Sequence, residues 1–275
     1  MAKSGNARSI LAGHARAVLR QRKEAVLTGR VEAVHQLRVA TRRLQETLSF
    51  LEPFLPGRPV KRLNRRARKV RRSLGSLRNA DVLVELVHEL RSSLPPARRE
   101  GLEPLAARLK REASALRRRA RGRKGLRVAP ISRRIDALLR CLPSGLEAPL
   151  ASRGEEVIAM RLRKVRQALP KARRGGAEAL HELRIKIKRY RYALEILDLA
   201  GIKTARPAIE RARSLQTALG KLHDVDVLIE LVKRSDPAMN RMFHAMLRGR
   251  RRQRLRDVEK LLKDPGAFLL ERKAA

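Results

Sequence analysis

The sequence predicts an all-α protein built from two pseudo-symmetric bundles of four helices each. Three observations lead to this expectation. Apolar residues, mostly Leu, Val and Ala, recur at helical spacing along nearly the whole chain of 275 residues. Two sequence blocks occur twice at almost the same separation, and no segment shows the alternating pattern of a β-strand. Together these observations indicate a helical unit that is present in two copies.

The repeat rests on one block around a histidine and one around a glycine. The first block reads HQLRVATRR from His35 and HELRIKIKR from His181, 146 residues later. The second reads GSLRNADVLVELV from Gly75 and GKLHDVDVLIELV from Gly220, 145 residues later. Two matches whose separations differ by a single residue are hard to obtain by chance, so we interpret the chain as an internal duplication.

Gly and Pro residues divide each copy into four expected helices. In the first copy, residues 1–120, the helices are expected over 8–31, 34–55, 59–92 and 96–120. In the second copy, residues 154–275, they are expected over 154–169, 176–200, 206–234 and 237–263. Residues 121–153 are rich in Gly and Pro, and we interpret them as a linker with one short amphipathic helix over 131–142.

The charge of the chain indicates the kind of partner. Lys and Arg number 67 against 27 Asp and Glu, a formal net charge of +40. Such an excess opposes compaction through self-repulsion, and a polyanionic partner relieves it. The chain has no Trp and only two Tyr and four Phe, so it offers few rings on which the bases of a single-stranded nucleic acid could stack.

Composition also excludes several classes of protein. The one cysteine, Cys141, excludes an intramolecular disulfide and a cysteine-based zinc site, and it fits a reducing compartment. No run of 18 apolar residues exists, so no transmembrane helix is expected. We therefore expect a cytoplasmic protein.

The histidine block predicts a cationic stripe on one helix of each copy. At 100° per residue, the basic companions of each histidine share its face, and the apolar residues occupy the opposite face. The first stripe contains His35, Arg38, Arg42 and Gln45, opposite Leu37, Leu44, Leu48 and Leu51; the second contains His181, Arg184, Lys188 and Arg191, opposite Leu183, Tyr190 and Leu194. A solvated face would normally mix the two signs of charge, and neither stripe holds an acid, so we favour an anion-binding role over plain solvation.

The third helix of each copy combines an apolar seam with basic neighbours. The seams are Leu63, Ala67, Val70, Leu74 and Leu77 in the first copy and Ala208, Ala212, Leu215, Leu219 and Leu222 in the second. Gly75 and Gly220 lie inside these helices, which predicts a close helix contact or a kink, with a tolerated defect as the alternative. Asp81 and Asp226 are acids in basic surroundings. They are expected to orient an Arg or His of the stripe, with an ordinary surface salt bridge as the alternative.

These residues resemble the CHAD family, helical domains named for their histidines. The resemblance covers nearly the whole chain and includes the His-x-x-Arg helix with basic residues seven and eight positions after the His. It also includes the Leu-Gly-x-Leu-Arg-Asp-x-Asp-Val-Leu element, at residues 74–83 and 219–228. The resemblance implies two four-helix bundles around a basic central channel, with inorganic polyphosphate bound there, no catalysis and no cofactor. The sequence departs from the family pattern at Gln45, at Asn79 and at His223, which stands at the position of Arg78.

The site expected from the stripes, the third helices and the resemblance is a set of cationic side chains. Arg presents a planar fork to phosphate oxygens, Lys a point charge, and His an N–H that gains a second donor on protonation. The predicted polyphosphate-binding residues are His35, Arg38, Arg42, Arg43, Arg68, Arg72, Arg78, His181, Arg184, Lys188, Arg189, Arg191, Arg213, Lys221 and His223. No catalytic residue and no metal ligand is expected, and the protein is expected to associate with polyphosphate granules.

Two other function classes stay open at this point. A protein that binds the phosphate backbone of nucleic acid would also be basic and helical, although no helix-turn-helix or zinc-finger spacing is visible. A metal-dependent phosphohydrolase would use His181, the His223-Asp224 pair and Asp257. The first copy has Arg78-Asn79 at the position of that pair, and these residues do not fit a metal site.

Overall fold

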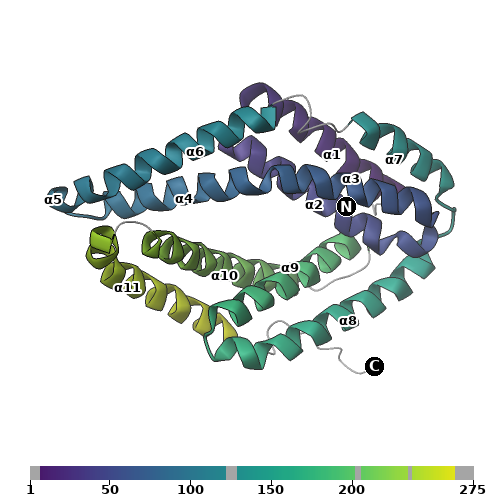
Figure 1. The fold of residues 1–275 in the computed structure, drawn as a ribbon. Coiled ribbons are helices and arrows are strands. Elements are labelled where there is room, and N and C mark those ends of the chain that lie inside the picture. The colour runs from purple at the N-terminus through teal and green to yellow at the C-terminus, as the bar shows by residue number, and fades with distance from the viewer. Residues whose placement is uncertain (1–6, 122–128, 202–205, 235–236, 264–275) are drawn as a thin grey trace. The chain divides into compact units, whose positions relative to one another are not determined.

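The computed structural model describes residues 7–121, 129–201, 206–234 and 237–263. In this part of the chain every regular element is helical, which confirms the all-α prediction (Figure 1). Residues 122–128 of the predicted linker lie outside the described residues. Of the described helices, none is both long enough and apolar enough to cross a membrane.

The described residues fall into two compact units that interleave along the chain. Unit 1 takes its residues from Met1–Glu85, Pro104–Gly154 and Ile196–Ile202. Unit 2 takes its residues from Leu86–Glu103, Glu155–Glu195 and Lys203–Ala275. The predicted copies, 1–120 and 154–275, are continuous stretches defined by sequence similarity, and the duplication stays a prediction.

Unit 1 is organised around α1 (Ala7–Thr28) and α2 (Val31–Phe50), which pack along each other. The short 3-10 helix η1 (Glu52–Phe54) leads into α3 (Gly57–Ser73), which packs on α2. The predicted short helix is present as α7 (Ala129–Cys141), and it packs on both α1 and α3 (Figure 1). Unit 1 also contains residues 75–85 of α4 (Gly75–Ser92) and nearly all of α6 (Glu103–Arg121), together with the first residues of α8 (Glu147–Arg173) and the last residues of α9 (Ala177–Leu199).

Unit 2 contains most of α8 and of α9, together with α10 (Arg206–Lys233) and α11 (Pro237–Leu262). The helices α10 and α11 pack against each other. The segment between α4 and α6 adds the short helix α5 (Pro96–Arg99) and the 3-10 helix η2 (Glu100–Leu102).

The apolar faces predicted from helical periodicity form the cores of the units. Leu37, Leu44 and Leu48 of α2 are fully buried, as are Leu183, Tyr190 and Leu194 of α9. The two seams are buried along their whole length: Leu63, Ala67, Val70, Leu74 and Leu77 in unit 1, and Ala208, Ala212, Leu215, Leu219 and Leu222 in unit 2. The stripe residues His35, Arg38, Arg42, His181, Arg184 and Lys188 are only partly buried, as expected for faces opposite the apolar cores, whereas Arg191 of the second stripe is buried.

The structure corrects several predicted helix bounds. The helix expected over 59–92 is two helices, because α3 ends at Ser73 and α4 begins at Gly75. The Ser73 hydroxyl donates a hydrogen bond to the Val70 carbonyl at 2.8 Å, which competes with the backbone ladder at the point where Gly75 weakens it. The equivalent helix α10 runs through Gly220 without a break, so of the two glycines only Gly75 coincides with an interruption of the helix.

Two further bounds differ for reasons of backbone chemistry. The helix expected over 96–120 is divided into α5, η2 and α6, and Gly101 lies in the 3-10 turn. The helix expected over 154–169 runs from Glu147 to Arg173 and contains Pro170. A proline near a helix end removes one backbone hydrogen bond, and neighbouring packing can compensate for that loss.

Candidate functional site

The cationic stripe of α2 lies beside basic residues at the junction of α3 and α4, all within unit 1. We call His35, Arg38, Arg42, Arg71 and Arg78 the unit 1 cluster; each of these side chains is half-buried. A guanidinium nitrogen of Arg38, Nη1, donates a hydrogen bond to the Arg71 carbonyl at 3.3 Å. The break between α3 and α4 falls between Arg71 and Arg78, and both act electrostatically on Arg38.

Positive charge is crowded in the unit 1 cluster. Burial lowers the pKa of Arg38, and the charges of Arg71, Arg78 and Arg42 lower that pKa further. The pKa of Arg71 is lowered by burial, then by Arg42 and Arg68, against a smaller opposing effect of Glu46. That carboxylate lies 3.9 Å from Nη2 of Arg42, a long ion pair. An anion placed among these guanidinium groups would relieve their mutual repulsion.

The stripe of α9 lies beside His223 of α10, all within unit 2. We call His181, Arg184, Lys188 and His223 the unit 2 cluster; each of these side chains is half-buried. The two imidazole rings are in contact, with their centroids 4.5 Å apart and their planes tilted by 46°. The Nδ1 atom of His181 is buried and makes no hydrogen bond to any residue that the structure describes.

The histidines of both clusters favour the neutral form. Burial lowers the pKa of His181, and Arg184 and Lys188 lower it further. Burial is also the largest effect on His223, followed by the charges of His181 and Arg184, whereas Asp226 raises its pKa. The pKa of His35 is lowered by burial and then by Arg78. Because an unperturbed histidine has a pKa near 6.5, lowered values leave these rings neutral at about pH 7.

The two glycines of the repeat lie against the two arginines of the stripes. A Cβ atom on Gly75 would lie 3.5 Å from Nη1 of Arg38, and one on Gly220 would lie 3.6 Å from Nε of Arg184. The predicted close contact is therefore present in both units, and its partner is the same arginine of the motif. With no Cβ at either glycine, the guanidinium group of each arginine packs directly against the helix backbone.

The aspartates of the repeat bind arginines that the sequence did not indicate. Asp81 accepts a hydrogen bond from Nη2 of Arg117 in α6 at 2.7 Å. Asp226 accepts one from Nε of Arg251 in α11 at 2.6 Å. Neither hydrogen bond goes to a stripe residue, but the charge of Arg78 acts on Asp81 and that of Asp226 acts on His223, so the orienting role of the aspartates stays a prediction. The alternative of a surface salt bridge is wrong for Asp81, because its side chain is only 2% exposed.

No spacing signal could have revealed these partners. The paired residues are 36 positions apart in unit 1 and 25 positions apart in unit 2, so the repeat does not relate them. Arg71 was missed for a different reason, because it borders the apolar seam of α3 and only the neighbouring α2 makes it part of a cluster.

The other predicted binding residues differ in their exposure. The exposed cations include Arg43, Arg68, Arg72 and Arg189, of which Arg68 and Arg72 act electrostatically on Arg71 of the unit 1 cluster. Arg191, in contrast, is buried: its Nη1 donates to Glu195 at 2.6 Å and its Nε to Gln216 at 3.1 Å. Its guanidinium group also lies 4.7 Å from the centre of the Tyr192 ring. Arg191 therefore belongs to the core of unit 2, because α9 buries most of its circumference towards its C-terminal end.

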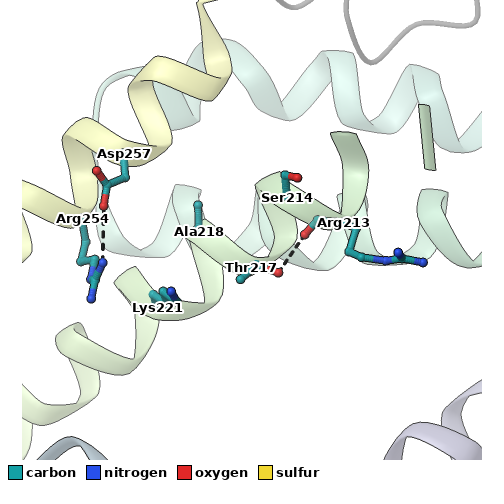
Figure 2. Close-up of a pocket in the computed structure, with 7 residues that line it drawn as sticks. All are labelled: Arg213, Ser214, Thr217, Ala218, Lys221, Arg254 and Asp257. Carbon is teal, nitrogen blue, oxygen red and sulfur yellow. Dashed lines mark hydrogen bonds and ion pairs between the residues drawn. The ribbon is translucent and has the colours of Figure 1, made fainter. Parts of the chain in front are cut away.

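Arg213 and Lys221 line an open hollow on unit 2 of about 410 Å³ (Figure 2). Its walls come from α10 and α11, and its other lining residues are Ser214, Thr217, Ala218, Arg254 and Asp257. Arg213 is paired with Glu210 at 2.8 Å, and Arg254 lies 3.5 Å from Asp257. The hollow thus combines three cations, two hydroxyls and one acid, which suits a phosphate-sized anion better than a metal ion.

The alternative metal set gains no support from the geometry. Asp257 lies in this hollow with Arg254, whereas His181 and His223 belong to the unit 2 cluster. Over the described ranges, no group of three or more His, Cys, Asp or Glu residues lies close enough to hold a metal ion.

Both units thus combine a histidine, an arginine and a glycine in the same arrangement. The sequence that carries them also matches a known protein family. The family model described as CHAD domain matches residues 9–233. The chain belongs to the CHAD domain family. Both clusters of this CHAD domain lie inside the matched residues, whereas α11 follows them, so Arg251, Arg254 and Asp257 stand outside the family match.

Solved structures share the fold of this CHAD domain. The crystal structure of the CHAD domain from the plant Ricinus communis is 22% identical, with a TM-score of 0.67, and the alignment covers 96% of this chain and 95% of that chain. PptA from Streptomyces chartreusis is 18% identical, with a TM-score of 0.61, and coverage of 94% and 97%. Comparison with the curated proteins finds no match. At these identities the likeness concerns the fold alone.

Proposed function

We propose that this CHAD domain binds inorganic polyphosphate and does not hydrolyse it. The observation that carries the proposal is the presence, in each unit, of a half-buried cluster of cations at the positions of the family motif. In unit 1, burial and neighbouring arginines lower the pKa of both Arg38 and Arg71, which means that the cluster holds more positive charge than its surroundings neutralise.

The chemistry of the clusters matches a polymer of phosphates. Guanidinium groups form paired hydrogen bonds to phosphate oxygens, and the chain supplies many of them with few aromatic rings among them. A ligand that touches several cations at once gains affinity from each further contact. Because each contact also releases counterions, the affinity should fall steeply as salt is added.

Within this proposal Arg38 and Arg184 are the central contacts. Each is half-buried, and each has its guanidinium group against a glycine of the repeat. Arg42, Arg71 and Arg78 add charge in unit 1, and Lys188 adds it in unit 2. Exposed cations extend the contact surface beyond the clusters: Arg43, Arg68 and Arg72 in unit 1, and Arg189, Arg213 and Lys221 in unit 2.

The test is a binding titration with two matched double variants. The first replaces Arg38 and Arg184 by Glu, and the second replaces Arg111 of α6 and Arg252 of α11 by Glu. Both variants change one residue per unit and alter the net charge equally, but Arg111 and Arg252 are exposed and outside the clusters. We expect the first to weaken long-chain polyphosphate binding at least about tenfold, or roughly 1.4 kcal/mol, and the second much less.

Three outcomes would contradict the proposal. One is an equal loss of affinity in both double variants while circular dichroism shows native helix content. Another is orthophosphate binding as tightly per mole as long chains. The third is release of orthophosphate from polyphosphate in the presence of Mg²⁺ or Mn²⁺ that disappears in His223→Ala.

Nucleic acid is the competing ligand to exclude. The α3 helix has nine Lys and Arg among its 17 residues and no acid, and such a face can also bind the phosphates of duplex DNA. Competition between polyphosphate and duplex DNA of equal charge decides between the two. We expect polyphosphate to displace the duplex, and the reverse order would favour the nucleic-acid function.

A further inference from the structure

The two clusters differ at one equivalent position. In unit 1 the second helix of the site presents Arg78, a permanent cation, near His35. In unit 2 the matching position is His223, whose ring contacts that of His181 at a centroid distance of 4.5 Å. Unit 2 therefore holds two titratable imidazoles in contact where unit 1 holds one imidazole and one arginine.

The charged groups around the histidine pair come from three helices. Arg184 and Lys188 of α9 act on both rings and disfavour their protonation. Asp226 of α10 is the opposing acid, and it is bonded to Arg251 of α11. With cations in excess and the rings partly buried, the pair is neutral at about pH 7 while no anion is present.

A bound phosphate changes this balance. Its negative charge favours the protonated form of a nearby imidazole, and the added N–H gives the ligand another charge-assisted hydrogen bond. The buried Nδ1 of His181 makes no hydrogen bond to the described residues. Two charged rings in contact would repel each other, so the pair as a whole accepts one proton more readily than two.

We propose that the His181–His223 pair takes up a proton from solvent when polyphosphate occupies the unit 2 cluster, so that binding there tightens as the pH falls. The inference rests on the proposed function, since it concerns the regulation of the same site. It assigns to unit 2 a pH-dependent contribution that the Arg78 position of unit 1 does not make. By linkage, one proton taken up on binding changes the affinity by at most about tenfold per pH unit.

The experiment compares the wild-type protein with His223→Arg and His223→Gln between pH 8 and pH 6. Long-chain polyphosphate is the probe, because few of its phosphates are terminal groups that titrate near pH 6. Calorimetry in two buffers of different ionisation enthalpy counts the protons taken up on binding. His35 contributes equally in all three proteins, so differences between them report the pair.

For the wild-type protein we expect proton uptake on binding and an affinity that rises as the pH falls. From pH 8 to pH 6 this rise in affinity should be about tenfold larger than the rise in His223→Arg. His223→Arg should bind more tightly than wild type at pH 8, because its charge is permanent. His223→Gln should lose the extra pH dependence and bind more weakly at pH 6. Arg78→His, the reverse exchange, should add pH dependence to unit 1.

The outcomes separate the two proposals. If polyphosphate binds and the three pH profiles are parallel, the proton-uptake inference is wrong and the proposed function stands. If polyphosphate does not bind at any pH while the proteins remain helical, the proposed function itself is wrong.

Discussion

Asp226 accepts a hydrogen bond from Nε of Arg251 at 2.6 Å, and this ion pair joins α10 to α11. Arg251 also donates to the carbonyl of Gly175, which ties the turn before α9 to the same point. In unit 1 the same role belongs to Asp81 and Arg117, which join α4 to α6. The hydrogen bonds of the two aspartates thus fix α6 in unit 1 and α11 in unit 2, rather than a residue of the stripe.

Removing the more buried of these carboxylates should destabilise unit 1. The side chain of Asp81 is 2% exposed and that of Arg117 is 27% exposed, so Asp81→Ala leaves a partly buried guanidinium group without its acid. We expect a loss of about 2 kcal/mol in the free energy of unfolding, measured by urea titration. Asp136→Ala on the exposed side of α7 is the control and should change stability by less than about 0.5 kcal/mol. Equal effects would contradict the structural role of Asp81.

Two glycine-to-alanine substitutions should change the stability of the protein in opposite directions. A Cβ on Gly154 would lie 2.8 Å from Cδ1 and 3.1 Å from Cγ of Leu197, so Gly154→Ala overpacks the contact between α8 and α9. We expect a loss of about 1 to 3 kcal/mol. Gly13, inside α1, has nothing within 4 Å of the added atom, and Gly13→Ala should stabilise by about 0.5 to 1 kcal/mol. Thermal unfolding of both variants checks the prediction, which fails if the two shift the midpoint in the same direction.

The stability of the protein should fall in mild acid because of His14. The Nδ1 atom of His14 lies 2.7 Å from the Thr47 hydroxyl, which itself donates to the Arg43 carbonyl. Burial, followed by the charge of Arg43, lowers the pKa of His14 to about 4. The unfolded chain, with a pKa near 6.5, then binds more protons, so the stability is fully present above about pH 6.5 and is lost as the pH falls towards 4.

The loss expected from His14 alone reaches about 3 kcal/mol at the acidic end of this window. The pKa values of His35, His181 and His223 are lowered as well, so these residues also reduce the stability in acid. The contribution of His14 is therefore measured as the difference between the wild type and a variant. Urea unfolding of the wild type and of His14→Gln at several pH values between 7.5 and 4.5 should give a flatter profile for the variant. Parallel profiles would show that His14 is not the group responsible.

Substitutions of Arg184 and Arg191 should affect different properties, although both residues lie on α9. The first should affect polyphosphate binding and the second the stability of the protein. Arg191 is buried and paired with Glu195, so Arg191→Gln should cost about 3 kcal/mol of unfolding free energy and leave polyphosphate affinity within about twofold. Arg184→Gln should lower the affinity severalfold and change stability little. Urea unfolding and calorimetric titration of both variants test this, and a loss of affinity in Arg191→Gln would return that residue to the site.

Much of the fold could be predicted because the periodicity of apolar residues shows which face of each helix is apolar. Leu37 and Leu183 are completely buried as expected, and the stripe residues on the other faces of α2 and α9 are half-buried, apart from Arg191. This periodicity does not show which neighbouring helix packs over residues at the border between the apolar and the polar face. For this reason the burial of Arg191 and the partners of the two aspartates could be found only from the packing of α6, α10 and α11.

The break between α3 and α4 shows a second limit. Gly75 and Gly220 stand at the same position of the repeat, yet only the first coincides with a helix end. The seventeen residues of α3 carry nine like charges, and their repulsion weakens that helix, whereas α10 includes acids such as Glu210. The sequence identifies a weak point, to which the like charges of α3 and the hydrogen bond of the Ser73 hydroxyl add in the first copy.

The interleaving of the two units along the chain has a consequence for biosynthesis. Unit 1 is opened by Met1–Glu85 but needs Ile196–Ile202 before all of its segments exist, and unit 2 needs residues up to α11. At about 5 to 20 residues per second, a ribosome takes roughly 6 to 25 s to travel from residue 85 to residue 202. During that interval the nine cations of α3 already belong to a nascent chain attached to the ribosome, whose RNA is a polyanion that attracts them. We therefore expect ionic strength to affect the release of the nascent protein from the ribosome surface more than it affects helix formation.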